Sequence, residues 1–457
     1  MRWRCLYRQW RRNQPQYSAE RGWVNSQCDV LVVDSTAQGA SSTMINVIPD
    51  AASAGAYTTG NGILLIEVLD NTASAAGIFM LAQPVILGAY EYTLYHNGRG
   101  TDASDGNWYL RNTAPDIIDP VDPPITVIPP VGPDPDPGVV TPIETTRPNI
   151  QPGVPVAMAM ILLATQYGYA MLDTLHERVG ETYPQQPIPV IKQYYVTDKL
   201  GQRQLVKIMP RNQEREAWFR GAWARLIGER GLRDRGNFTR HGADYVYNFG
   251  GIQAGIDVYA REQSDQTLDK VGLYVGYGQI RSKVTAAYGG KAGTIDMDAY
   301  TIGGYWIHFS PNNWYTDAVV QGTWYSSDSS TVTGQRLKSD GLGLIASLEG
   351  GYTFNLKDGW AIEPQAQVVY QNVSFDKFND GRALYDVNSG DSLRGRVGLR
   401  IKKDWNTAFD QAKPRLITTW LRANVWHEFL GNSKLTVPST QGYKPGSVLH
   451  TAQRNMG

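Results

Sequence analysis

Two histidine–glutamate pairs, His176–Glu177 and His427–Glu428, come nearest to a catalytic motif in this 457-residue chain. A zinc helix of the H-E-x-x-H type needs a second histidine one turn later, because two imidazoles on one helix face bind the metal. Both pairs lack it, and the six histidines show no ligand spacing. The sequence has no G-x-S-x-G elbow or P-loop, and no G-x-G-x-x-G joins a strand to a helix. It therefore predicts no enzyme, and no catalytic, cofactor-binding or metal site. An enzyme carried by a chain segment upstream of this one would leave no trace here.

Charged and amide side chains recur at every second position in the C-terminal half. Side chains of a strand point to alternate faces, so residues two apart share one face. In residues 359–373, the other parity is apolar and aromatic. This pattern is typical of a membrane β-barrel, whose lumen is polar and whose outer face is apolar. The candidates for the lumen are Glu363, Gln365, Gln367, Arg394, Arg396, Arg400 and Arg422.

Aromatic residues lie near the ends of the apolar faces. In residues 314–325, one parity begins with Trp314 and ends with Trp324, and the other includes Asp317 and Gln321. Ten steps of ~3.3 Å, tilted by ~40°, span about 25 Å, which is the height of the apolar band of an outer-membrane barrel. The candidates for the two lipid interfaces are Trp314, Trp324, Trp360 and Tyr370.

The alternation recurs often enough to predict the fold class. Nine strands are expected, at 217–228, 245–262, 268–281, 294–309, 312–326, 341–356, 359–374, 391–403 and 414–430. An antiparallel sandwich shows the same alternation, but its strands are usually shorter and lack aromatic girdles. We therefore predict an all-β protein with a transmembrane antiparallel β-barrel at 217–430. No run of about 18 apolar residues occurs, as a membrane helix would need. The net charge of zero gives no reason to expect nucleic acid as a partner.

The rest of the chain divides by composition. Residues 1–23 hold six arginines and are expected to be a disordered basic tail, and 24–114 alternate short apolar runs with turns, as in a small β module. Residues 115–155 contain thirteen of the 25 prolines, which predicts a polyproline II spacer. Residues 156–216 begin with a helix that ends near Gly180, followed by a connector of unknown role. A disulfide between Cys5 and Cys28 is one expectation for an oxidising compartment, but spacing alone does not establish it.

Several segments together resemble the type V autotransporters. TTGNGILLIEV, GAYEYTLYHNG and DGNWYLRN resemble the C-terminal, autochaperone part of a pertactin-like passenger, and PVAMAM, QYGYAMLDTLHERVG and EAWFRGAWARLIG follow in the family's order. The resemblance implies a β-helix-like passenger remnant, a helix in the pore and a barrel in the outer membrane, with the passenger at the cell surface. It also implies barrel-assembly machinery, periplasmic chaperones and outer-membrane lipid as partners. We expect a monomer that uses no small-molecule substrate. Some autotransporters cut their passenger inside the barrel, but no motif here transfers that role to Asn149.

The number of strands leaves the activity open. The family's barrel has twelve strands, about three more than the nine predicted, and residues 431–457 look irregular. No signal peptide is recognisable. We therefore expect an autotransporter translocator that exports and anchors a passenger. The alternatives are a non-functional fragment truncated at both ends, or the anchor of a surface adhesin.

Overall fold

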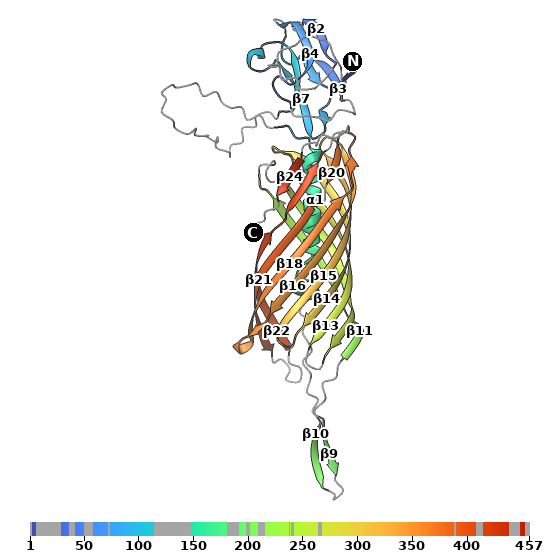
Figure 1. Cartoon of the computed structure of the whole chain (residues 1–457), viewed down its shortest axis with the longest axis vertical. Coiled ribbons are helices and arrows are strands. Elements are labelled where there is room, and N and C mark those ends of the chain that lie inside the picture. Colours follow the sequence, from blue (N-terminus) through green and yellow to red (C-terminus); the bar gives the residue numbers. More distant parts are fainter. Residues whose placement is uncertain are drawn as a thin grey trace, which may run out of the picture.

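The computed structural model describes most of the chain. The described residues are 2–5, 29–35, 42–49, 58–71, 74–113, 148–180, 192–197, 202–208, 215–236, 238, 242–263, 267–387, 390–407, 415–437 and 448–452. An N-terminal β module lies above a tall curled sheet, and a β-hairpin extends below it (Figure 1). We call the two ends of the curled sheet the module end and the hairpin end. Cys28 lies outside the described residues, so the structure does not test whether it pairs with Cys5.

The N-terminal module contains parallel and antiparallel strand pairs. Its strands are β2 (Leu31–Ser35), β3 (Thr43–Pro49), β4 (Ile63–Asp70), β5 (Phe79–Leu81), β6 (Val85–Leu87), β7 (Tyr90–His96) and β8 (Trp108–Arg111), with the 3-10 helix η2 (Gly100–Asp102). The parallel pairs β2–β4 and β3–β5 match the expectation of β-helix rungs, and the antiparallel β7–β8 pair follows them. Ile66, Trp108 and Leu110 are nearly fully buried between the strands. Within the predicted disordered tail, β1 (Arg2–Cys5) is instead a strand paired in parallel with β3.

His96 makes the stability of this module depend on pH. Its Nε2 atom lies 2.9 Å from the Ser74 hydroxyl, and its ring packs on Trp108. Burial lowers the pKa of His96 below its ordinary value, against the opposing charge of Asp105. The folded module therefore binds fewer protons than the unfolded chain just below about pH 6.5, so its stability falls as the pH drops through this range.

Proteolysis in urea measures this effect. In the full chain, we expect the module to become susceptible to proteolysis at a lower urea concentration at about pH 5.5 than at about pH 7.5. His96→Gln should reduce the difference. An equal shift in His96→Gln and the parent chain would contradict the role of His96.

Nine long strands form the curled sheet. They are β11 (Arg215–Arg233), β12 (Tyr245–Glu262), β13 (Leu268–Thr285), β14 (Lys291–Phe309), β15 (Trp314–Thr331), β16 (Arg336–Tyr352), β18 (Trp360–Phe375), β21 (Gly390–Thr407) and β22 (Arg415–Glu428). Each pairs antiparallel with the next in the order of the chain. The short β17 (Phe354–Asn355) also pairs with β18, and η3 (Lys357–Gly359) separates the two. Within the described residues, no pairing joins β11 to β22, so these strands are the edges of an open sheet. The nine predicted strands are all present, and most are longer than predicted.

Two helices lie on the concave side of this sheet. Helix α1 (Gly153–Leu172) contacts β12 to β16 and β18, and the shorter α2 (Leu175–Val179) follows it. The sequence predicted one helix; Asp173, at φ 54°, interrupts it. The backbone there is left-handed, which few residues other than glycine adopt. By length and composition, α1 could cross a bilayer, but it is mostly buried inside the protein.

Smaller elements lie at the two ends of the curled sheet. At the hairpin end, β9 (Lys192–Thr197) and β10 (Arg203–Ile208) pair antiparallel, in the connector to which the sequence assigned no role. Near the module end, β19 (Phe378–Asn379), β20 (Leu384–Val387), β23 (Asn432–Thr436) and β24 (Val448–Ala452) form a four-stranded sheet. The last two strands lie in the segment predicted to be irregular.

The chain returns to the module after its proline-rich segment. Thr113 and Pro148 form a β-bridge, and Ile150 forms another with Tyr90. Three backbone hydrogen bonds reinforce this return: Asn149 to Asn112, Glu91 to Asn149, and Gln151 to Ala89. The expected spacer therefore starts and ends at the same place, and the module lies directly on the curled sheet (Figure 1).

Candidate functional site: a charged helix corner inside the sheet

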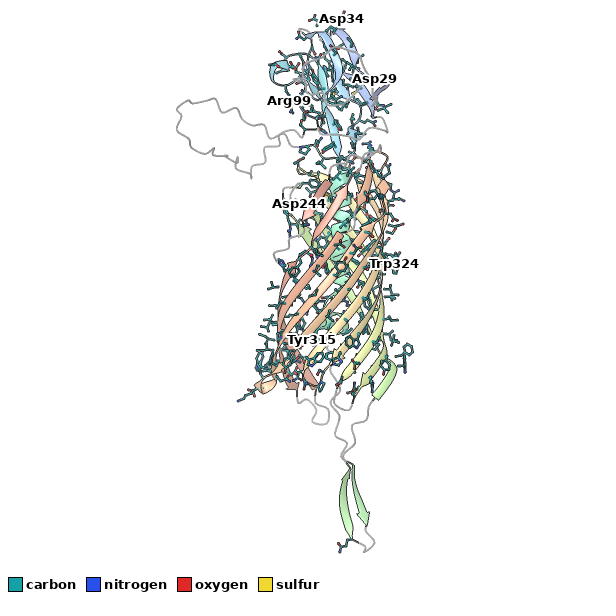
Figure 2. The ribbon with its side chains drawn as sticks, in the orientation of Figure 1. Asp29, Asp34, Arg99, Asp244, Tyr315 and Trp324 are labelled. Atoms are coloured by element: carbon teal, nitrogen blue, oxygen red, sulfur yellow. The ribbon has the colours of Figure 1, made fainter. Side chains whose placement is uncertain are left out.

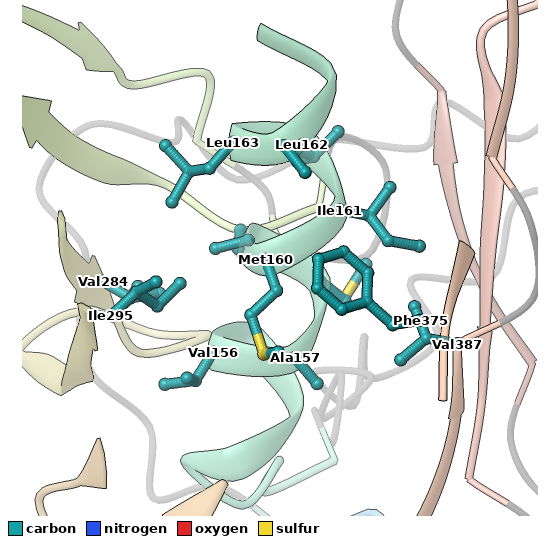
Figure 3. Close-up of a cluster of buried hydrophobic side chains, with 14 of the residues drawn as sticks. Val156, Ala157, Met160, Ile161, Leu162, Leu163, Val284, Ile295, Phe375 and Val387 are labelled. Carbon is teal, nitrogen blue, oxygen red and sulfur yellow. The ribbon is translucent and has the colours of Figure 1, made fainter. Parts of the chain in front are cut away.

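Helix α1 is held in the sheet mainly by apolar contacts near the module end. Val156 and Met160 lie beside Val284 and Ile295, and Phe375 lies on the opposite side of the helix (Figure 3). Closer to the hairpin end, Tyr167 passes so close to Gly278 that a β-carbon there would lie 2.4 Å from its hydroxyl oxygen. The small residues of β13 thus leave room for the large residues of the helix.

Residues 173–178, which we call the charged corner, join α1 to α2. The N–H of Asp173 donates to the carbonyl of Tyr169 and ends α1, and the Asp173 carboxylate accepts from the N–H of Thr174. The break turns the following side chains toward different strands. Four of the corner's six residues bear groups that ionise: Asp173, His176, Glu177 and Arg178.

The two basic groups of the corner meet acidic residues of the sheet. Arg178 donates from Nη2 to both carboxylate oxygens of Asp317, at 2.7 Å each, and both side chains are almost completely buried. His176 Nε2 lies 2.9 Å from Glu363. These pairs compensate for the removal of charge from water, which is otherwise costly.

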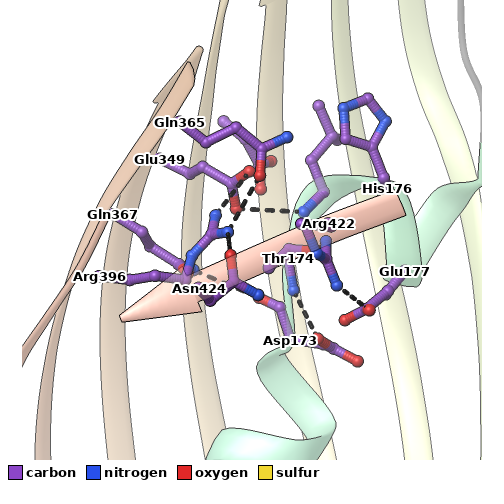
Figure 4. A network of polar contacts seen from close by, with 12 residues as sticks. Asp173, Thr174, His176, Glu177, Glu349, Gln365, Gln367, Arg396, Arg422 and Asn424 are labelled. Carbon is purple, nitrogen blue, oxygen red and sulfur yellow. Dashed lines mark hydrogen bonds and ion pairs between the residues drawn. The ribbon is translucent and has the colours of Figure 1, made fainter. Parts of the chain in front are cut away.

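The two acidic groups of the corner meet arginines on the other side. Arg225 of β11 contacts Asp173 at 3.1 Å, and Arg422 of β22 pairs with Glu177. Arg422 also donates to the Thr174 hydroxyl at 2.8 Å (Figure 4). Acidic and basic residues of the sheet are thus matched, pair by pair, to basic and acidic residues of the corner.

Behind the corner, the strands share a second network. Arg396 contacts Glu349 at 3.0 Å and donates to Gln365, Gln367 and Asn424 at 2.9–3.0 Å (Figure 4). Glu349 accepts from the Tyr315 hydroxyl and the backbone N–H of Leu175. The concave face of the sheet is therefore hydrogen-bonded to the beginning of α2.

The seven residues predicted for the lumen all point to the concave side. They are buried or nearly so: Glu363, Gln365, Gln367, Arg394, Arg396, Arg400 and Arg422. Among them, Glu363 meets His176, and the Arg394 guanidinium lies 3.8 Å from the ring centroid of Tyr169. Arg396 instead meets Glu349.

The seven lumen candidates did not include Asp317, Glu349 or Arg225. The signal for Asp317 was present, since it shares its face with Gln321 in a strand that alternates clearly. Of the two histidine–glutamate pairs, His176, Glu177 and Glu428 make polar contacts, whereas the His427 ring packs against Phe429. Glu428 accepts from the Ser392 hydroxyl and the N–H of Leu393. The described residues contain no cluster that could hold a metal ion.

The four predicted interface aromatics lie on the outer face. Trp314, Trp324, Trp360 and Tyr370 are 40%, 53%, 44% and 43% exposed. Trp324 projects outward from the sheet (Figure 2), and the exposed Val320 lies on the same face of its strand. Trp314 and Trp360 begin their strands at the hairpin end, and Trp324 and Tyr370 lie ten residues further along them. The spacing fits the apolar band of a bilayer.

A buried contact joins the module to the four-stranded sheet at the module end. The Gln151 amide donates to the Gly88 carbonyl at 3.0 Å and to the Tyr385 hydroxyl at 2.6 Å. Tyr385, on β20, donates in turn to Asp380 at 2.9 Å. Asn149 bonds to the backbone of Glu91 in the module rather than lying among the acidic residues of the concave side.

Long antiparallel strands with an apolar outer face and a polar concave face that encloses a helix are typical of the outer-membrane β proteins. The sequence model of the autotransporter beta-domain matches residues 222–455, and that of the autochaperone domain type 1 matches residues 19–94. The chain belongs to the autotransporter family and is an outer-membrane autotransporter. The alternative of a truncated, non-functional fragment finds no support in these matches.

Several similar proteins are named as autotransporters, and others are named as uncharacterized. The chain is 29% identical to the adhesin BmaC autotransporter of Brucella suis, over 90% of this chain and 11% of that protein. It is 26% identical to the uncharacterized protein YdeU of Escherichia coli, over 96% and 85% of the two chains. The pertactin autotransporter of Bordetella bronchiseptica is 27% identical over 46% of this chain and 22% of its own length. The chain thus spans a small part of BmaC and most of YdeU.

Among solved structures, the transport unit of the autotransporter AIDA-I from Escherichia coli aligns with a TM-score of 0.43 at 18% identity. That alignment covers 51% of this chain and 76% of that one. The beta domain of the Bordetella autotransporter BrkA aligns with a TM-score of 0.38 at 24% identity, over 47% and 83% of the two chains. Neither score reaches 0.5, so the family assignment rests on the sequence.

Proposed function

We propose that the curled sheet holds residues 24–114 at the cell surface, after this segment has passed through its concave side. The observation that supports this most directly is the path of the chain. It leaves the module, runs along the concave side as α1, turns at the charged corner and continues toward the hairpin end, where β11 begins (Figure 1). With the chain in this position, the module end of the sheet would face the cell exterior and the hairpin end would face the periplasm.

The two faces of the sheet support insertion into lipid. Outward residues such as Val320, Leu421 and Val425 are between 66% and 73% exposed, and a lipid environment would cover them. The polar concave face accommodates the chain, with Glu363, Gln365, Gln367, Arg394, Arg396, Arg400 and Arg422 as lumen residues. Trp314, Trp324, Trp360 and Tyr370 would lie at the lipid interfaces.

The partners in this proposal are outer-membrane lipid, the barrel-assembly machinery and periplasmic chaperones. The sheet acts as a monomer, without nucleic acid or a small-molecule substrate, and the transport step needs no catalytic residue. A second candidate is that the sheet only anchors a surface adhesin. The name of BmaC as an adhesin favours it, although this chain covers a small fraction of that protein.

Cysteine labelling in intact cells tests the proposal. Cys5 and Cys28 are replaced by serine, the chain is expressed behind a cleavable secretion signal, and a membrane-impermeant maleimide is added. Thr101→Cys, exposed in the module, should be labelled in intact cells. Lys357→Cys, exposed at the hairpin end, should be labelled only after permeabilisation.

Labelling of Lys357→Cys but not Thr101→Cys in intact cells would reverse the proposed orientation and refute it. A second experiment, in which the module and the sheet are produced as separate chains, distinguishes anchoring from transport. Absence of the labelled module from both the cell surface and the medium, when it is not joined to the sheet, supports transport. A labelled module released into the medium supports mere anchoring.

A further inference from the structure

The two edge strands of the open sheet are attached to the same short segment of the chain. Each strand contributes one arginine: Arg225 from β11 and Arg422 from β22. Both arginines bind the charged corner, residues 173–178. We propose that this corner is a clasp, which fixes the distance between the two edges of the sheet through Arg225 and Arg422 as positioning residues.

In the described residues, no backbone pairing holds the two edge strands at a fixed distance. All eight pairings between neighbouring long strands are antiparallel, and none connects β11 with β22. Both edge strands run from the hairpin end to the module end, because an even number of reversals separates them. A direct pairing between them would be parallel, unlike every other pairing of this sheet. The width of the seam therefore depends on other contacts.

On the β11 side, Arg225 uses its whole guanidinium. Nε donates to Gln253 at 2.6 Å, and Nη1 donates to the Asp173 carboxylate and the Glu177 carbonyl at 3.1 and 3.2 Å. Nη2 donates to the carbonyls of Ala170 and Met171 at 3.3 and 2.8 Å. These five acceptors match the five N–H groups of arginine. The Ala170 and Met171 carbonyls belong to the C-terminal turn of α1, where a cation is also favoured by the helix dipole.

On the β22 side, Arg422 binds the start of helix α2. It donates to the Thr174 hydroxyl and pairs with the Glu177 carboxylate. Glu177 therefore contacts both edges, with its carbonyl on Arg225 and its carboxylate on Arg422. The opposite face of the corner is anchored to the middle of the sheet by Arg178–Asp317 and His176–Glu363. The corner is thus bound to the central strands on one side and, through one arginine each, to the two edge strands on the other.

The distance between spin labels on the two edges tests the clasp. In the full chain folded in detergent, with Cys5 and Cys28 replaced by serine, labels are placed at Leu226→Cys and Leu421→Cys. Both side chains point outward and are 84% and 73% exposed. A reference pair, Leu273→Cys and Leu348→Cys, lies on β13 and β16 within the sheet. Pulsed electron paramagnetic resonance then gives the distribution of distances for each pair.

We expect a narrow distribution for both pairs in the parent chain. Arg225→Gln with Arg422→Gln should broaden the distribution of the edge pair and leave the reference pair unchanged. Arg225→Lys with Arg422→Lys should restore part of the narrow distribution, since a point charge still attracts Asp173 and Glu177. Arg281→Gln, which removes an exposed ion pair with Asp296 on the outer face, is the matched control and should change neither pair.

Two results would overturn the clasp. The first is an edge-pair distribution that stays narrow in the double glutamine variant. The second is equal broadening of both pairs, because the clasp acts only at the seam. If the double variant does not fold, Glu177→Gln replaces it. This change weakens the arm to Arg422 alone, and a lack of edge-pair broadening in it would equally refute the proposal.

Discussion

Replacing Arg178 with alanine is expected to destabilise the folded protein by about 3–5 kcal/mol, because it leaves a buried carboxylate without its counter-charge. The Arg178 side chain is fully buried and Asp317 is 2% exposed, so water cannot replace the lost contact without rearrangement. The free energy of unfolding is measured by urea titration in detergent, with the shift in gel migration on boiling as the signal for the folded sheet.

A double-mutant cycle gives the control for this prediction. Arg178→Met with Asp317→Leu removes both charges and keeps most of the volume, and such replacements of buried pairs are often close to neutral. The double variant should therefore be more stable than Arg178→Ala. A loss below about 1 kcal/mol in Arg178→Ala, the value of an exposed ion pair, would show that the site is open to water.

Leu163→Asp should displace helix α1 from the concave side. Leu163 is fully buried among apolar residues of the helix and sheet, and a carboxylate there would have no partner (Figure 3). The cost of burying it unpaired is several kcal/mol, more than the ~2–5 kcal/mol of a Leu→Ala cavity. Since the helix fills the concave side, its displacement should raise the single-channel conductance in planar bilayers.

The controls for Leu163→Asp separate charge from volume. Leu163→Met conserves volume and should leave the conductance low, and Leu163→Ala should destabilise the fold while keeping the helix inside. An unchanged conductance in Leu163→Asp would mean that the helix does not block the path.

The sequence predicted the strands well because their pattern is local. In β15, each residue from Trp314 onward follows the same alternation, so one strand is enough to assign Asp317 and Gln321 to the concave face. The faces of Glu363, Arg396 and Arg422 followed in the same way. The period of the side chains determines the face, but not which residue of another strand lies opposite.

The charged corner could not be predicted from such patterns. His176 and Glu363 are 187 positions apart, and they meet only because the helix is placed at one depth in the sheet. The break at Asp173 depends on a left-handed backbone conformation, which aspartate rarely adopts and no nearby proline or glycine signals. The bridge between Thr113 and Pro148 spans the proline-rich segment, and no local pattern indicates it either. The open seam, in contrast, agrees with the odd number of strands that the sequence already predicted.

Because Thr113 and Pro148 form a β-bridge, the chain between them does not have to connect two separated parts of the fold. The 34 residues between these two positions begin and end at one point of the fold. Insertions and deletions in this segment should therefore be nearly neutral for stability, which makes it a natural position for evolutionary change in length and for the insertion of a foreign peptide.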